Sequence, residues 1–146
     1  TTSVQIESLI QEYLKRLTHY IPFVLQVIPE LKNTKALTPE QQKLAEGELI
    51  LRAINSSTDL VLLDEHGKEF RSIEFADYVQ KRMSSGRDVV FVVGGPYGFS
   101  EAVYQRANGK ISLSKMTFSH QMVRLFFVEQ LYRAMTILRG EPYHHE

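Results

Sequence analysis

The run Val89 to Val93 constrains the fold of this chain more than any other feature of the sequence. Four of its five residues are valine and the fifth is Phe91. β-branched and aromatic side chains favour extended backbone. A strand that is apolar at every position, instead of at alternate positions, is typical of parallel sheets that are covered on both faces. The run therefore predicts an α/β structure with a buried central strand.

The rest of the sequence is consistent with strands that alternate with helices. Thr38 followed by Pro39 is typical of a helix start, with Thr38 as the N-cap, and Ser100 is a second candidate cap. The 146 residues fit a single domain, 1–146, with one core. We predict a mainly parallel sheet with helices on both faces. Strands are expected at 23–28, 59–63 (followed by a turn at 64–67), 89–93 and 110–113, and helices at 3–18, 39–54, 72–86, 100–107 and 120–138.

In an open parallel sheet, ligands bind beyond the carboxyl ends of the strands. Three segments qualify here, and they follow Leu63, Val93 and Leu113. Gly94 begins the sequence Gly94-Gly95-Pro96-Tyr97-Gly98, and glycine lets the backbone approach a ligand closely. We expect a branched side chain at Gly94 to fill ligand space; a plain strand-to-helix turn is the alternative.

The run 113–118 is a mixed polar and apolar loop before the last helix. Its backbone amides and small apolar groups are suited to line a pocket. Alternatively, Leu113, Met116 and Phe118 cover the core, and the residues alone favour this second interpretation.

The last expected helix is apolar nearly all round, which indicates burial on more than one side. In so small a domain a second subunit is a natural cover, and a central core helix of a monomer is the alternative. Glu129 and Arg133 are spaced to pair across one helical turn. Arg124 lies in the first turn, where a cation opposes the helix dipole; this placement points to a ligand or partner, or to a solvated side chain.

Composition narrows the classes of function. The 17 Lys and Arg residues balance the 17 Asp and Glu residues, so a general nucleic-acid binder is not indicated, and an RNA substrate would need a local patch or a folded shape. Absence of cysteine excludes thiol chemistry and fits the cytoplasm. The apolar runs are too short to span a membrane, and we expect no membrane partner. The five histidines form no metal-binding spacing, so no metal is expected.

Several segments together resemble one family. They are DVVFVVGGPYG (88–98), LSKMTF (113–118), His120, Arg124, EQLYRA (129–134) and PYH (142–144). This combination is similar to the RlmH family, which are SPOUT-class enzymes that methylate N3 of a pseudouridine in helix 69 of 23S rRNA. The resemblance covers essentially the whole chain, and its most specific parts are EQLYRA and the terminal PYH.

The resemblance implies a C-terminal trefoil knot, a homodimer with opposed knots, and S-adenosylmethionine bound in the knot. It also implies that the substrate is ribosomal RNA, on the assembled ribosome. Carried over by position, the cofactor-binding residues would be Leu63, Gly94, Leu113, Ser114, Lys115, Met116, Thr117 and Phe118.

Two departures from the family pattern stand out. The family opens with a short apolar strand that this sequence lacks, so we expect that the sequence begins inside a longer gene product. His145 stands where lysine or arginine is common, which removes one fixed positive charge from the tail.

Methylation of a pseudouridine N3 must also remove a proton. The candidate proton acceptors are His144, His120 and Glu129, with Tyr143 as a positioning group and Arg124 as a stabiliser of the developing anion. We also expect the tail to reach the cofactor pocket of a partner subunit. Two other functions remain open: methylation of another RNA position, such as a ribose 2′-hydroxyl, and RNA binding without catalysis.

Overall fold

A computed structural model describes residues 3–22, 34–94 and 97–145. The expected strand at 23–28 lies outside these residues. The elements run in the order α1 (Val4–Leu17), a 3-10 helix (Thr34–Ala36), α2 (Pro39–Arg52), β1 (Asp59–Glu69), α3 (Ser72–Ser84), β2 (Val89–Val93), α4 (Glu101–Arg106), β3 (Gly109–Ser112) and α5 (His120–Leu138).

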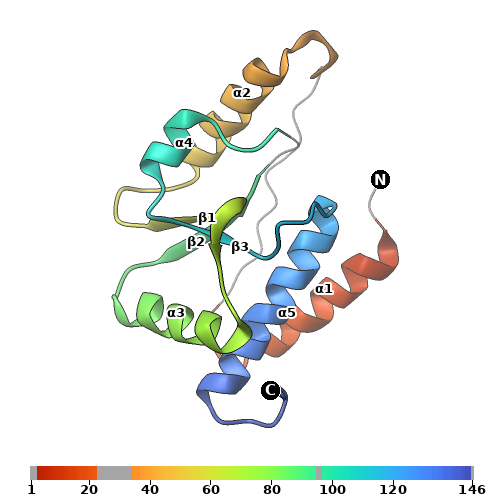
Figure 1. Cartoon of the computed structure of the whole chain (residues 1–146), viewed down its shortest axis with the longest axis vertical. Helices are drawn as coiled ribbons and strands as arrows, with labels where there is room; N and C mark the ends of the chain where they lie inside the picture. Colours follow the sequence, from red (N-terminus) through yellow and green to blue (C-terminus); the bar gives the residue numbers. More distant parts are fainter. Residues whose placement is uncertain (1–2, 23–33, 95–96, 146) are drawn as a thin grey trace.

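The three described strands form one sheet in the order β2-β1-β3, and both pairings are parallel (Figure 1). The central strand β1 is the longest, and β2 is the valine-rich run that the sequence singled out. The predicted α/β class with a parallel sheet is confirmed.

Helices cover both faces of this sheet, because the side chains of β1 alternate between two cores. Val61 and Leu63 pack with α1, α3 and α5, whereas Leu60 and Leu62 pack with α2 and α4. All four side chains are at most 9% exposed. A segment covered on both sides favours apolar residues at every position, which is why residues 60–63 of β1 and the whole of β2 are apolar without alternation.

β1 is longer than predicted, and the expected turn at 64–67 is an irregularity inside it. Leu63 and Lys68 both pair with Ile111 of β3, so the residues between them bulge out of the ladder. The backbone N–H of His66 donates to Asp64 Oδ1 at 3.0 Å, a typical turn contact of aspartate. Gly67 lies against β3 so closely that a Cβ atom there would come within 2.7 Å of backbone atoms of Ile111. The turn chemistry was therefore visible in the sequence, but the return of the chain to the same ladder was not.

The two helix caps predicted from the sequence are confirmed. Thr38 and Ser100 are N-caps whose side chains accept hydrogen bonds from the backbone N–H groups of Gln41 and Val103. Such bonds satisfy donors that a helix start leaves without intrahelical partners.

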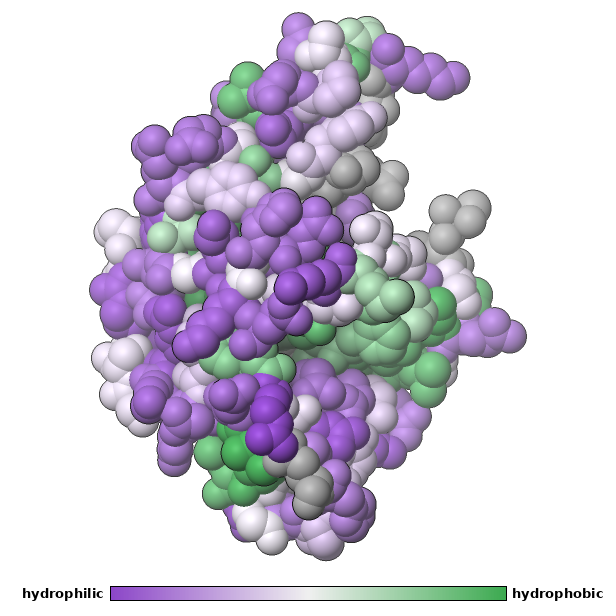
Figure 2. All heavy atoms as spheres, in the orientation of Figure 1, coloured by the Kyte–Doolittle hydropathy of each residue, from purple (hydrophilic) through white to green (hydrophobic). Residues whose placement is uncertain are grey.

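Burial of α5 on several sides is achieved within one chain. Its buried side chains include Phe127, Val128, Leu131, Ala134 and Met135, and they join a core formed with α1, α3 and the sheet. The apolar circumference of α5 by itself therefore does not require a second subunit. Figure 2 shows hydrophobic surface where α1 and α5 lie side by side. Exposed large apolar side chains in this part of the chain are Val4, Leu9 and Phe126, together with Met116 in the preceding loop.

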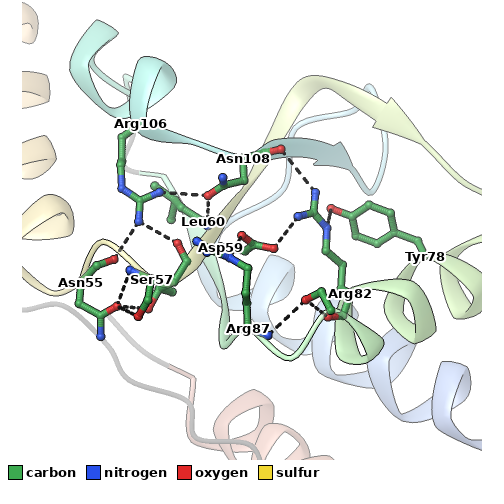
Figure 3. A network of polar contacts seen from close by, with 11 residues as sticks. Asn55, Ser57, Asp59, Leu60, Tyr78, Arg82, Arg87, Arg106 and Asn108 are labelled. Carbon is green, nitrogen blue, oxygen red and sulfur yellow. Dashed lines mark hydrogen bonds and ion pairs between the residues drawn. The ribbon is translucent and has the colours of Figure 1, made fainter.

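A polar network holds the amino ends of the strands (Figure 3). Asp59 begins β1 and accepts hydrogen bonds from Arg82 at 2.9 Å and from Arg87 at 2.7 Å. The side chain of Asn108, just before β3, accepts from the backbone N–H of Leu60 at 2.8 Å. The network occupies the amino end of the sheet, opposite the end where a ligand is expected.

Candidate active site

The three segments predicted to bind a ligand meet at one edge of the sheet. Leu63 of β1 is in register with Val93 of β2, which immediately precedes Gly94. Leu63 is also in register with Ile111 of β3, two residues before Leu113. Parallel pairing therefore brings Leu63, Gly94 and Leu113 together at the carboxyl edge.

Gly94 has a structural neighbour that the sequence did not reveal. A Cβ atom at this position would lie 3.0–3.3 Å from three ring carbons of Phe99. Phe99 is 5% exposed and packs with Leu60 and Leu62. A side chain at position 94 would therefore meet a buried aromatic ring, and the missing side chain allows close packing. Whether a branched side chain there would also fill ligand space stays a prediction.

The loop from Leu113 to Phe118 divides between core and surface. Leu113 is partly buried against the main core, and Phe118 lies edge-to-face with Phe126 at 5.2 Å between ring centroids. Lys115, Met116 and Thr117 are exposed, and Met116 is 73% exposed. The alternative that this loop covers the core is thus correct for Leu113 and wrong for Met116.

A second group of candidate residues lies at the other end of α5. Glu129 Oε1 accepts hydrogen bonds from Arg133 Nε at 2.9 Å and from Arg133 Nη2 at 2.6 Å, so the predicted pairing across one turn is present. The tail joins this pair: Arg133 Nη1 lies 3.0 Å from His144 Nδ1, and the Tyr143 hydroxyl donates to Glu129 at 3.3 Å. Tyr143 and His144 are half-buried, so the last residues are held in place by side-chain contacts although they lie outside any helix.

Burial and neighbouring side chains shift the pKa values of Tyr143 and Arg133. Burial raises the pKa of Tyr143 above its ordinary value, and the hydrogen bond with Tyr13 and the charge of Glu129 act in the same direction. The hydrogen bond to Glu129 raises the pKa of Arg133, against the effect of desolvation. Tyr143 therefore keeps its proton at neutral pH and acts as a hydrogen-bond donor.

The candidate catalytic residues fall into two separate groups within one chain. His120 and Arg124 lie in the first turns of α5, next to the loop 113–118. His144 contacts Arg133. Arg133 lies about 20 Å from His120 along the axis of α5, at a rise of 1.5 Å per residue. In Figure 1 the C-terminus lies at the opposite end of α5 from the loop that precedes this helix.

A family model described as "Predicted SPOUT methyltransferase" matches residues 1–144. The chain belongs to the SPOUT methyltransferase family. This result confirms the resemblance found in the sequence.

Curated relatives of this SPOUT chain carry one name, ribosomal RNA large subunit methyltransferase H. The Bacteroides thetaiotaomicron protein is 64% identical over 138 residues, which cover 94% of this chain and 88% of that protein. The Christiangramia forsetii protein is 62% identical over 146 residues, covering 99% and 93%. The Flavobacterium johnsoniae protein is 58% identical over 147 aligned positions, covering 100% and 94%.

Among solved structures, the similarity to Nep1 of Archaeoglobus fulgidus bound to S-adenosylhomocysteine is low. The identity is 21%, the TM-score is 0.38, and the match covers 62% of this chain and 38% of that chain.

A cavity of about 470 Å³ in this SPOUT chain is lined by none of the predicted cofactor residues, although Asp64, which directly follows Leu63, lies in its wall. Its lining includes Asp64, His66, Tyr104 and Lys110. The Tyr104 hydroxyl donates to Asp64, and burial followed by this hydrogen bond raises the pKa of Tyr104 to about 12.

Within residues 3–22, 34–94 and 97–145, no three or more His, Asp or Glu side chains are grouped as a metal site would require. In the same ranges, no helix has the length and apolar character needed to cross a membrane.

Proposed function

We propose that this chain is an S-adenosylmethionine-dependent methyltransferase that acts on RNA of the large ribosomal subunit. The observation that carries the proposal is the 58–64% identity to proteins named for this activity, over nearly the full length of both partners. The specific acceptor that we propose is N3 of a pseudouridine in helix 69 of 23S rRNA, on the assembled ribosome. The place of action is the cytoplasm, where ribosomes are found.

The proposed cofactor site is the carboxyl edge of the sheet. Leu63, Gly94 and the loop from Leu113 to Phe118 converge there, and this loop lies outside helix and strand. Its backbone groups are suited to hydrogen-bond an adenine ring, and its polar side chains are Ser114, Lys115 and Thr117. The cofactor supplies an electrophilic methyl group. The protein must hold the acceptor in line with that group, and such alignment lowers the barrier substantially.

The proposed assembly is a homodimer in which the trefoil knots oppose each other. The separation of the two catalytic groups supports this arrangement, because Arg133, which contacts His144, lies about 20 Å along α5 from His120. A second copy would place the tail of one subunit at the cofactor loop of the other. The exposed apolar side chains Phe126 and Met116, near that loop, suit a surface covered by a partner.

The proposed chemistry assigns one step to each group. His144 Nδ1 accepts a hydrogen bond from Arg133, so His144 takes up the proton of the acceptor nitrogen at Nδ1 once that hydrogen bond is released. Tyr143, whose hydroxyl donates to Glu129, positions the RNA base through its aromatic ring. Arg124 stabilises the negative charge that develops on the base. His120 is the second candidate base.

Methyl transfer from labelled S-adenosylmethionine tests the proposal. The protein is incubated with free 23S rRNA, isolated large subunits or whole ribosomes from cells that lack the activity. Nuclease digestion and mass spectrometry then locate the methyl group. A methylated pseudouridine base in 23S rRNA is the expected product. A methylated ribose would redirect the proposal to another RNA position, and binding of ribosomes without any transfer would favour a non-catalytic module.

A further inference from the structure

The C-terminal tail is linked to α1 by a hydrogen bond between two tyrosines. The Tyr13 hydroxyl lies 3.3 Å from the Tyr143 hydroxyl, and 130 positions separate the two residues in sequence. The Tyr143 hydroxyl donates to Glu129. A hydroxyl carries one hydrogen, so Tyr13 is the donor to Tyr143. The chain of contacts continues from Glu129 through Arg133 to His144.

Ring packing supports the same contact. Tyr132 of α5 packs against both tyrosines, with its ring centroid 5.8 Å from that of Tyr13 and 4.8 Å from that of Tyr143. Tyr20, just after α1, also packs edge-to-face on Tyr132 at 5.8 Å and donates to Glu141 at 2.8 Å. The tail therefore packs against α1 and the residues that directly follow this helix.

The tail depends on these contacts for its position, because the helical hydrogen bonds of α5 end before it. α5 ends at Leu138, and Gly140 has a positive φ of 69°, which turns the chain away from the helix axis. Residues 141–145 belong to no helix or strand. Chain ends without such contacts are usually disordered.

We propose that Tyr13 is a positioning residue of this enzyme: its hydroxyl fixes Tyr143, and through Glu129 and Arg133 it holds His144 in one orientation. The catalytic consequence rests on the proposed function, whereas the order of the tail does not. Tyr13 itself contacts neither cofactor nor RNA in this role; it acts through the tail.

The first experiment measures the order of the tail without any substrate. Backbone ¹⁵N relaxation is recorded for the full chain, for Tyr13→Phe and for the matched control Tyr78→Phe. The control also removes one tyrosine hydroxyl, but at the amino end of the sheet. There the Tyr78 hydroxyl accepts a hydrogen bond from Arg82, which pairs with Asp59, at 3.1 Å. We expect the order parameters of Tyr143 to His145 to fall below about 0.6 in Tyr13→Phe only. An unchanged tail in a folded Tyr13→Phe protein overturns the inference, whether or not the protein methylates RNA.

The second experiment measures kcat and KM for methyl transfer to ribosomes. Loss of one hydrogen bond predicts a decrease in kcat of about fivefold to tenfold for Tyr13→Phe, with KM for S-adenosylmethionine within about twofold because uniform binding is untouched. Tyr78→Phe should retain wild-type kcat.

A double-variant cycle separates positioning from general stabilisation. If Tyr13 acts through Tyr143, the double variant Tyr13→Phe/Tyr143→Phe is no slower than Tyr143→Phe alone. If the decrease in kcat of the double variant equals the product of the two single decreases, the inference is overturned. Failure of the wild-type protein to transfer methyl groups would contradict the proposed function, and the relaxation experiment would still decide the role of Tyr13 in holding the tail.

Discussion

Phe99 lies so close to Gly94 that a Cβ atom at position 94 would come within 3.0 Å of its ring. Gly94 begins the segment that leaves β2, and Phe99 belongs to the core between the sheet and α4. The glycine thus serves the packing of this core in addition to any contact with a ligand.

Gly94→Val should therefore destabilise the fold. Inserting atoms into a packed core typically costs about 1–3 kcal/mol of the free energy of unfolding. Urea denaturation measures this cost. Combining Gly94→Val with Phe99→Leu should cost less than the sum of the two single variants, because the smaller side chain relieves the crowding. Strict additivity would show that Phe99 is not the cause.

Asp59→Asn should lower stability in a pH-dependent way. Hydrogen bonds from Arg87 and Arg82 lower the pKa of Asp59, against the effect of desolvation. A lowered folded-state pKa stabilises the protein above the unfolded-state pKa of about 3.9, and this stabilisation is lost as the pH falls through the folded-state value.

Urea denaturation of wild type and Asp59→Asn over a range of pH tests this dependence. The difference between them should be fully present at pH 7 and shrink below about pH 4. Asp77→Asn is the matched control, because Asp77 forms an exposed pair with Lys81 on α3 and should change stability little. An equal effect of both variants at pH 7 would contradict the prediction.

Tyr104→Phe should remove a late step from the alkaline titration of the protein. Burial, followed by the hydrogen bond to Asp64, raises the pKa of Tyr104 to about 12, and burial with the hydrogen bond to Glu141 does the same for Tyr20. Unperturbed tyrosines titrate at about pH 10. A raised pKa stabilises the fold below about pH 10, and this contribution is lost as the pH rises through 12.

Ultraviolet absorbance of the phenolate form follows this titration. Tyr104→Phe and Tyr20→Phe should each reduce the amplitude near pH 12 and leave the amplitude near pH 10 unchanged. A loss confined to the earlier step would refute the assignment for that tyrosine.

A mixed dimer tests whether the tail acts on the partner's cofactor site. One subunit lacks Tyr143 to Glu146, and the other carries Thr117→Trp, which places a bulky ring in the exposed cofactor loop. Calorimetry must first show that Thr117→Trp abolishes S-adenosylmethionine binding. If the tail acts in trans, one complete site remains and about half of the wild-type rate survives, as expected for two equivalent sites. If the tail acts within its own chain, neither site is complete and the mixed dimer is inactive.

Local features of the sequence predicted much of the fold. The valine-rich run became β2, and Thr38 and Ser100 became helix caps because capping depends on a side chain and a backbone N–H three residues away. The pairing of Glu129 with Arg133 followed from the pitch of a helix. The meeting of Leu63, Gly94 and Leu113 at one edge followed from parallel pairing alone.

Other features depend on residues that are distant in sequence. β1 continues past its bulge because it returns to the ladder of β3, and backbone pairing of this kind leaves no local signal. The packing of the Phe99 ring against Gly94 is of the same kind, because five positions of the chain separate the two residues and no local pattern marks the contact.

By itself, the sequence determined the α/β class, the family and the elements that carry the candidate site, because strand burial, helix caps and helical spacing all act over a few residues. Only the tertiary structure decided that α1 and α3 cover α5, that Tyr13 holds Tyr143, and that His144 lies far from His120 within one chain. These relationships arise when the apolar faces of separate helices are buried together, and that burial brings together polar side chains whose proximity no local pattern encodes.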